Sequence, residues 1–73
     1  MDERVVVSPT AGTFTPLIGV DTDVDVDQVI GQVCAGDEVV DVCTRFAGRL
    51  VAMVAWKGER VQAFQRVAWL RAA

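Results

Sequence analysis

Few residues in this chain could do chemistry: the adjacent carboxylates Asp37 and Glu38, the single lysine Lys57, and the cysteines Cys34 and Cys43. Adjacent carboxylates act as general acid and general base only inside a pocket that also supplies complementary groups. The chain has no histidine, the commonest general base, and no glycine-rich phosphate loop. We therefore expect a protein that is not an enzyme and has no catalytic residue.

The two cysteines do not form a recognisable metal site. Cys34 and Cys43 are nine residues apart, and without any histidine they cannot complete a usual zinc set. We expect two reduced and partly buried thiols and no bound metal.

An aspartate-rich segment, residues 21–32, has carboxylates at alternate positions, as a calcium loop does. Its sixth position is Val26 where a calcium loop requires glycine, and its twelfth is Gln32 where that loop has glutamate. In a strand the aspartates would share one solvent-facing side, and Val24 and Val26 would point inward. We therefore expect a charged strand surface and no calcium.

Composition limits the possible partners. The chain has 73 residues, of which 52% are hydrophobic and 23% charged, which is typical of one small folded domain. Ten acidic residues against seven basic ones give a net charge of -3, which argues against nucleic acid because a phosphate backbone requires clustered cations. No apolar run approaches the about 18 residues of a membrane span, and no signal peptide is recognisable, so we expect a cytoplasmic protein without a membrane partner.

Secondary structure is dominated by short valine-rich segments with alternating polar and apolar residues, which predict an all-β fold. The predicted strands are residues 4–8, 23–26, 29–33, 39–43, 49–54 and 67–70. Helical spacing can also be fitted to residues 61–70, but we favour a strand because that segment is short.

The chain also contains an internal repeat. Ala11 and Gly12 align with Ala47 and Gly48, and after a shift of one residue, 24–28 align with 61–65 and 30–33 with 67–70. We therefore predict a single domain, residues 1–73. Its two half-motifs, about 4–33 and 44–70, are joined by a hairpin over 34–43 with its tip at Gly36 and Asp37.

The quoted motifs resemble a known family. "SPTAGTFTP" is similar to the segment that opens biotin carboxyl carrier domains, and "FAGRLVAMVAWKGERVQAFQRVAWL" is similar to their closing half. The resemblance to the biotinyl/lipoyl domain family covers residues 5–70. It implies a flattened β-barrel, or barrel-sandwich hybrid, of two quasi-symmetric four-stranded sheets.

The resemblance fails at one decisive position. The hairpin tip of the family reads Ala-Met-Lys-Met, and its lysine forms an amide with biotin; here those four positions are Ala35, Gly36, Asp37 and Glu38. An ionised aspartate only accepts hydrogen bonds and cannot serve as an amine nucleophile. We therefore expect no cofactor and a non-catalytic interaction or assembly module, in contact with an acyl-CoA carboxylase type of complex. The alternative is a genuine biotin or lipoyl carrier modified at Lys57.

A protein partner requires a surface, and two aromatic residues are the candidates. Phe64 stands at a turn position where the family uses glycine; Asp27, which tolerates a left-handed turn, stands at the matching position of the first half. If the turn is retained, Phe64 is exposed, and Trp56 in the preceding turn could lie on the same side. Carboxylase subunits or a second copy of the chain could then bind these rings. The alternative is a shifted register that buries Phe64 in the core. Four arginines could surround the binding surface, namely Arg45, Arg49, Arg60 and Arg66.

Overall fold

A computed structural model describes residues 2–72, which form eight β-strands and no helix. In chain order the strands are β1 (Glu3–Val7), β2 (Gly12–Pro16), β3 (Asp23–Val24), β4 (Val29–Ala35), β5 (Glu38–Cys43), β6 (Gly48–Met53), β7 (Arg60–Val61) and β8 (Arg66–Ala72). Within this part of the chain, therefore, nothing helical is long and apolar enough to cross a membrane.

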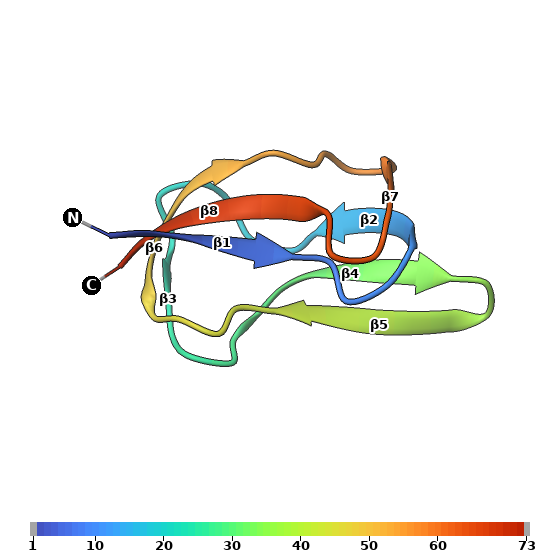
Figure 1. The fold of residues 1–73 in the computed structure, drawn as a ribbon, viewed down its shortest axis with the longest axis horizontal. Helices are drawn as coiled ribbons and strands as arrows, with labels where there is room; N and C mark the ends of the chain where they lie inside the picture. The colour runs from blue at the N-terminus through green and yellow to red at the C-terminus, as the bar shows by residue number, and fades with distance from the viewer. Residues whose placement is uncertain (1, 73) are drawn as a thin grey trace.

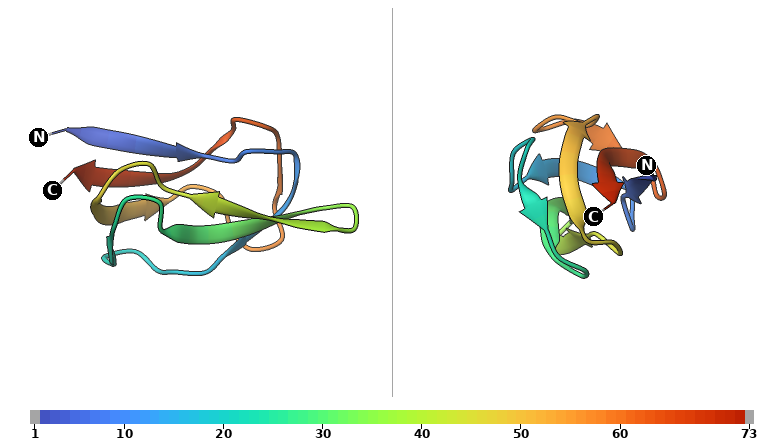
Figure 2. Two further views of the ribbon diagram at one scale, coloured as in Figure 1. Left: turned by 90° about the horizontal axis from the view of Figure 1, so that it is seen from below. Right: turned by 90° about the vertical axis from the view of Figure 1, so that its left-hand side faces the viewer.

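The strands form two four-stranded sheets with the orders β1-β8-β6-β3 and β5-β4-β2-β7 (Figure 1). All the recorded strand pairs are antiparallel. The molecule is elongated, 37 × 19 × 18 Å, and both chain ends lie at the end opposite the β4–β5 hairpin (Figures 1 and 2). The predicted all-β flattened sandwich is confirmed.

Alternation along the strands directs one apolar row from each sheet inward, and these rows make a single core. The ring of Phe14 and the side chains of Ile30, Leu50 and Leu70 are fully buried at its centre. The remaining buried apolar residues are Val6, Val24, Val33, Val42, Ala55, Val61, Val67 and Ala68.

The two halves of the chain are built alike. Moving four strands along the chain converts the order β1-β8-β6-β3 into β5-β4-β2-β7, which is the order of the second sheet. The turns repeat as well: the N–H of Phe64 donates to the carbonyl of Ser8 (2.7 Å), and the N–H of Asp27 donates to the carbonyl of Thr44 (2.8 Å). Each half is therefore anchored to the other by the same bond.

The one-residue shift in the sequence repeat has a structural cause. In the pairing of β6 with β8, Leu50 lies opposite Leu70 and Ala52 opposite Trp69, so Val51 is an extra residue in a β-bulge. The corresponding stretch of β2 pairs with β4 without interruption. The bulge inserts one residue into the second half and moves the two repeats out of phase.

The repeated Ala-Gly motif marks a close approach of a neighbouring backbone in each half. A Cβ on Gly12 would overlap the carbonyl oxygen of Cys34, and a Cβ on Gly48 would overlap that of Arg71. Both obstacles are backbone atoms, which cannot rotate away as a side chain can. Glycine is therefore required at both positions.

Several sequence predictions are corrected. Strands β2 and β7 were not predicted, because β2 is bounded by Gly12 and Pro16 and β7 has only two residues. The helical alternative for 61–70 is wrong, because this segment comprises the end of β7, a turn and most of β8. The other predicted strands are present, and none of their bounds is shifted by more than two residues.

The aspartate-rich strand is shorter than predicted. It ends at Val24, which is buried, because Asp27 adopts a left-handed conformation (φ 66°) in the turn that follows. Val26 lies in that turn and is 57% exposed, so the prediction that it points inward is wrong. The cysteines are also more exposed than predicted, because each follows a buried valine on its strand and so faces outward.

Candidate functional site

The β4–β5 hairpin ends in the turn that the sequence predicts. Pairing continues to Ala35 opposite Glu38, which leaves Gly36 and Asp37 as the two turn residues. Gly36 has a φ of 64°, which suits the first position of a tight hairpin turn, and a Cβ at this glycine would meet no atom within 4 Å. The hairpin projects beyond the rest of the molecule (Figures 1 and 2).

The functional groups at this tip are carboxylates. Asp37 and Glu38 are exposed, and within residues 2–72 neither side chain makes a hydrogen bond or an ion pair. Neither lines either of the two concave surfaces described below. The tip therefore presents two carboxylates, which are hydrogen-bond acceptors, outside either concave surface.

Lys57 is located on a different element, the connection between β6 and β7. Trp56 to Glu59 form a turn in which the N–H of Glu59 donates to the carbonyl of Trp56 (3.1 Å) and Gly58 has a φ of 86°. The carboxylate of Glu59 accepts the N–H of Trp56 (3.2 Å) and closes the turn from its other side. Lys57 and Trp56 are both exposed, with Trp56 at 70%.

Phe64 is exposed, so the alternative of a buried Phe64 is wrong. It has a φ of 66°, matching Asp27 in the other half, and 76% of it is accessible. The turn is held by the bond from Phe64 to Ser8 and by the N–H of Gln62, which donates to the side chain of Gln65 (2.9 Å). A left-handed conformation costs a residue with a Cβ about 1–2 kcal/mol, and the chain itself provides no burial that offsets this cost.

Phe64 stands beside a groove that lies between β1 and β5, the outer strands of the two sheets. The groove has a volume of about 500 Å³. It is lined by Val5, Val6, Val7, Pro9, Asp27, Asp41, Cys43, Thr44, Arg45, Phe46 and Phe64. We call this surface the β1–β5 groove.

The structure does not bring the two predicted aromatic residues together in this groove, since Trp56 is absent from its lining. The second ring in the groove is Phe46, which is 40% exposed and was missed by the sequence analysis. A signal for it exists in the repeat, because Phe46 aligns with the polar Thr10 and thus places an aromatic ring in a surface connection. Thr44 orients this connection by accepting the N–H of Phe46 (3.1 Å) through its hydroxyl.

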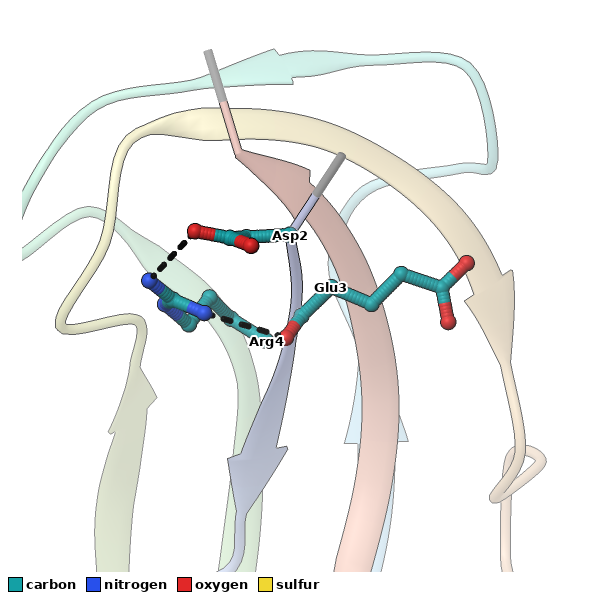
Figure 3. A network of polar contacts seen from close by, with 3 residues as sticks. All are labelled: Asp2, Glu3 and Arg4. Carbon is teal, nitrogen blue, oxygen red and sulfur yellow. Dashed lines mark hydrogen bonds and ion pairs between the residues drawn. The ribbon is translucent and has the colours of Figure 1, made fainter.

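Arg4, the basic residue that lies over the ring of Phe46, is already engaged. The guanidinium of Arg4 lies 5.2 Å from the centroid of the Phe46 ring, donates to the carboxylate of Asp2 (3.3 Å) and contacts the carbonyl of Glu3 (3.4 Å; Figure 3). Cation–π contacts of this length are attractive and help to fix the ring. Of the four arginines expected around a binding surface, only Arg45 lines the β1–β5 groove.

The other expected rim arginines lie elsewhere. Arg49 donates through Nε to the carboxylate of Asp23 (3.0 Å), in a second, more open concavity of about 530 Å³ at β3 and β6. This hydrogen bond and the charge of Asp23 raise the pKa of Arg49. Arg66 lies 6.0 Å from the ring centroid of Trp69. Throughout residues 2–72, no three potential metal ligands are grouped closely enough to hold an ion.

Comparisons with known proteins establish the fold. No protein-family model and no curated protein matches the chain. The chain is similar to part of the urea carboxylase of Kluyveromyces lactis, with a TM-score of 0.89 and 21% identity over 97% of this chain and 6% of that one. It is also similar to part of an aspartoacylase family protein of Mesorhizobium loti, with a TM-score of 0.77 and 23% identity over 90% of this chain and 22% of that one.

The chain spans less than a quarter of either structural neighbour. At 21% and 23% identity, the similarity establishes a shared fold and nothing about residues. The names of the two neighbours refer to different chemistry, so this fold occurs in more than one kind of protein. The chain therefore has the fold of a segment found inside a carboxylase and inside an aspartoacylase family protein.

Proposed function

We propose that this chain is a biotin-carboxyl-carrier-like domain that has lost its attachment lysine and acts as a non-catalytic interaction or assembly module. The observation that carries this proposal is the hairpin turn, in which Gly36 and Asp37 occupy the two positions between the paired residues Ala35 and Glu38. The carrier chemistry of the family requires an amine at this tip, and a carboxylate supplies none.

The fold supports the carrier-like part of the proposal. A segment of the same architecture lies within a urea carboxylase, at a TM-score of 0.89. A carboxylase complex is therefore our proposed setting, with its subunits as candidate partners and the cytoplasm as the compartment. The binding surface that we propose contains Phe64, with Trp56 as a second exposed ring on a different connection.

The runner-up is a true carrier modified at Lys57. One observation favours it: Lys57 is the only lysine of the chain and stands exposed in a tight turn. Its surroundings differ from those of a carrier hairpin, because it lies between Trp56 and Gly58 on the β6–β7 connection. We therefore retain it only as the outcome that the following experiment can detect.

The test is the intact mass of the chain after coexpression with a biotin ligase and excess biotin, and separately with a lipoate ligase. The proposal predicts the mass of the unmodified chain in both cases. A mass increase by one biotinyl or lipoyl group would overturn it. Loss of that increase in Lys57→Arg would then establish the alternative.

A further inference from the structure

We propose that the β1–β5 groove binds a second copy of this chain, with Phe64 of each copy inserted beside Phe46 of the other. This inference rests on the proposed role as an interaction module and specifies its surface and partner. Three features of the groove carry it: the exposure of Phe64, the unmatched charges of the walls, and the form of the two outer strands.

The first feature is an aromatic ring held outward in a conformation that does not suit it. Phe64 has the same φ as Asp27, 66°, but aspartate visits this region far more readily than phenylalanine does. The ring is 76% exposed, so its own fold does not bury it. The neighbouring groove, about 500 Å³, is large enough to accept a phenylalanine side chain from another molecule.

The second feature is the charge of the walls, which selects a second copy as the occupant. Arg45 has no carboxylate within salt-bridge distance among residues 2–72, and neither Asp27 nor Asp41 has a basic partner there. Arg4, by contrast, is already paired with Asp2. A partner of one charge sign would leave one set of these groups unmatched.

A two-fold axis resolves this mismatch. In an isologous contact the same patch meets itself, so Arg45 of each copy can face the carboxylates of the other. The apolar part of the patch, which includes Val7 at 36% exposure and Phe46 at 40%, is buried between the two copies. Charge complementarity and aromatic burial are thus satisfied by one arrangement.

The third feature excludes a simpler type of contact, the addition of a strand to an open edge. Among residues 2–72, no strand pairs with the outer edge of β1 or of β5. However, β1 carries Glu3 and Arg4, and β5 carries Glu38 and Asp41. Charged side chains are a usual protection of an edge strand, so side chains and not backbone groups should make this contact.

The experiment is sedimentation equilibrium of the full chain over a dilution series. We expect a reversible dimer, and Phe64→Gly should raise its dissociation constant at least about tenfold. Trp56→Ala is the matched control, because Trp56 is exposed to a similar extent, 70%, but lies outside the groove. It should leave dimerisation unchanged. Phe64→Asn, which also suits a left-handed turn, repeats the test if the glycine variant does not fold.

Charge reversal tests the two-fold pairing. Arg45→Glu alone, and Asp27→Arg with Asp41→Arg alone, should each weaken self-association because like charges then meet. Mixing the two variants should restore a dimer of wild-type affinity. The proposal is overturned if the wild-type chain is monomeric at its highest soluble concentration, if Trp56→Ala weakens the dimer as much as Phe64→Gly does, or if mixing restores nothing.

These outcomes are independent of the test of the proposed function. A monomeric chain of unmodified mass would remove the dimer and leave the non-carrier role intact. A dimer that carries biotin would support the dimer and overturn the proposed non-carrier role. Each failure is therefore identified by its own measurement.

Discussion

The two halves of this molecule share a backbone and differ in the side chains that they present to solvent. Ser8 and Thr44 accept the same crossing hydrogen bond, and the glycines of the repeated Ala-Gly motif face the same obstacle. At equivalent turn positions, however, one half has Asp27 and the other has Phe64, both with a φ of 66°.

This difference separates residues that specify the fold from residues available for function. Where a neighbouring backbone atom leaves no room for another side chain, the two halves have the same residue type, as at Gly12 and Gly48. Where the side chain faces water, they diverge, and the divergence in the second half adds an aromatic ring to the β1–β5 groove. A position that breaks the internal symmetry at the surface is therefore a better candidate for binding than one that preserves it.

The largest predicted effect concerns the positions at which the halves agree most closely. Gly12→Ala and Gly48→Ala should each destabilise the domain by about 3 kcal/mol, at the upper end of the range for overpacking, because the new Cβ overlaps a backbone carbonyl. Gly19→Ala is the control, since nothing lies within 4 Å of a Cβ there. Urea unfolding of the three variants measures the difference. Equal stability of all three would mean that the neighbouring strand of the same sheet does not approach these glycines this closely.

A smaller loss of stability is expected at a core position that the two halves fill with different pairs of residues. A Cβ on Gly31 would lie 2.8 Å from the ring of Phe14 and 2.9 Å from the carbonyl of Thr15. The equivalent pair in the other half is Leu50 and Ala68, both buried. Gly31→Ala should therefore cost about 1–3 kcal/mol.

A double-mutant cycle tests whether the residues at positions 14 and 31 depend on each other. Phe14→Leu should reduce the cost of Gly31→Ala, because it removes the ring that the new methyl group would meet. The rescue should be partial, since the Thr15 carbonyl remains 2.9 Å from that methyl group. Strictly additive free energies of unfolding would contradict this account of the pair.

The smallest effect concerns the turns at which the halves diverge. Phe64→Gly should leave the monomer as stable as the wild type or up to about 1 kcal/mol more stable, because glycine removes the strain of a positive φ but also increases the entropy of the unfolded chain. Asp27→Gly should stabilise the monomer less than Phe64→Gly does, because aspartate tolerates a positive φ. Thermal melting at a concentration where the chain is monomeric compares the two. A melting temperature lowered by many degrees in Phe64→Gly would indicate that the ring supports the fold.

Much of this architecture follows from local patterns. Alternating valines predict six of the strands, and the Ala-Gly repeat predicts two equivalent halves. The hairpin turn at Gly36 and Asp37 follows from the same alignment, because pairing on either side of a two-residue turn leaves little freedom of register. The exposure of Phe64 follows from the left-handed conformation that its turn requires.

The features that could not be predicted depend on contacts between distant parts of the chain. The two-residue strand β7 is defined by its pairing with β2, and has no periodicity of its own. The β1–β5 groove is lined by outer strands of different sheets. Phe46 reaches it through a connection whose course is set by Thr44. Val26 was misplaced because alternation does not indicate where a strand ends.

Our central proposal is that this chain is a carrier framework whose hairpin tip has lost its lysine. The most direct measurement is the intact mass of the variant Gly36→Met, Asp37→Lys, Glu38→Met after coexpression with a biotin ligase and biotin. Asp37→Lys alone is made in parallel, because it keeps glycine at the positive φ of position 36. The account predicts that the triple variant folds and gains one biotinyl group that the wild-type chain lacks. A folded triple variant that retains its unmodified mass would contradict the claim, because the differences from a carrier domain would then extend beyond the tip.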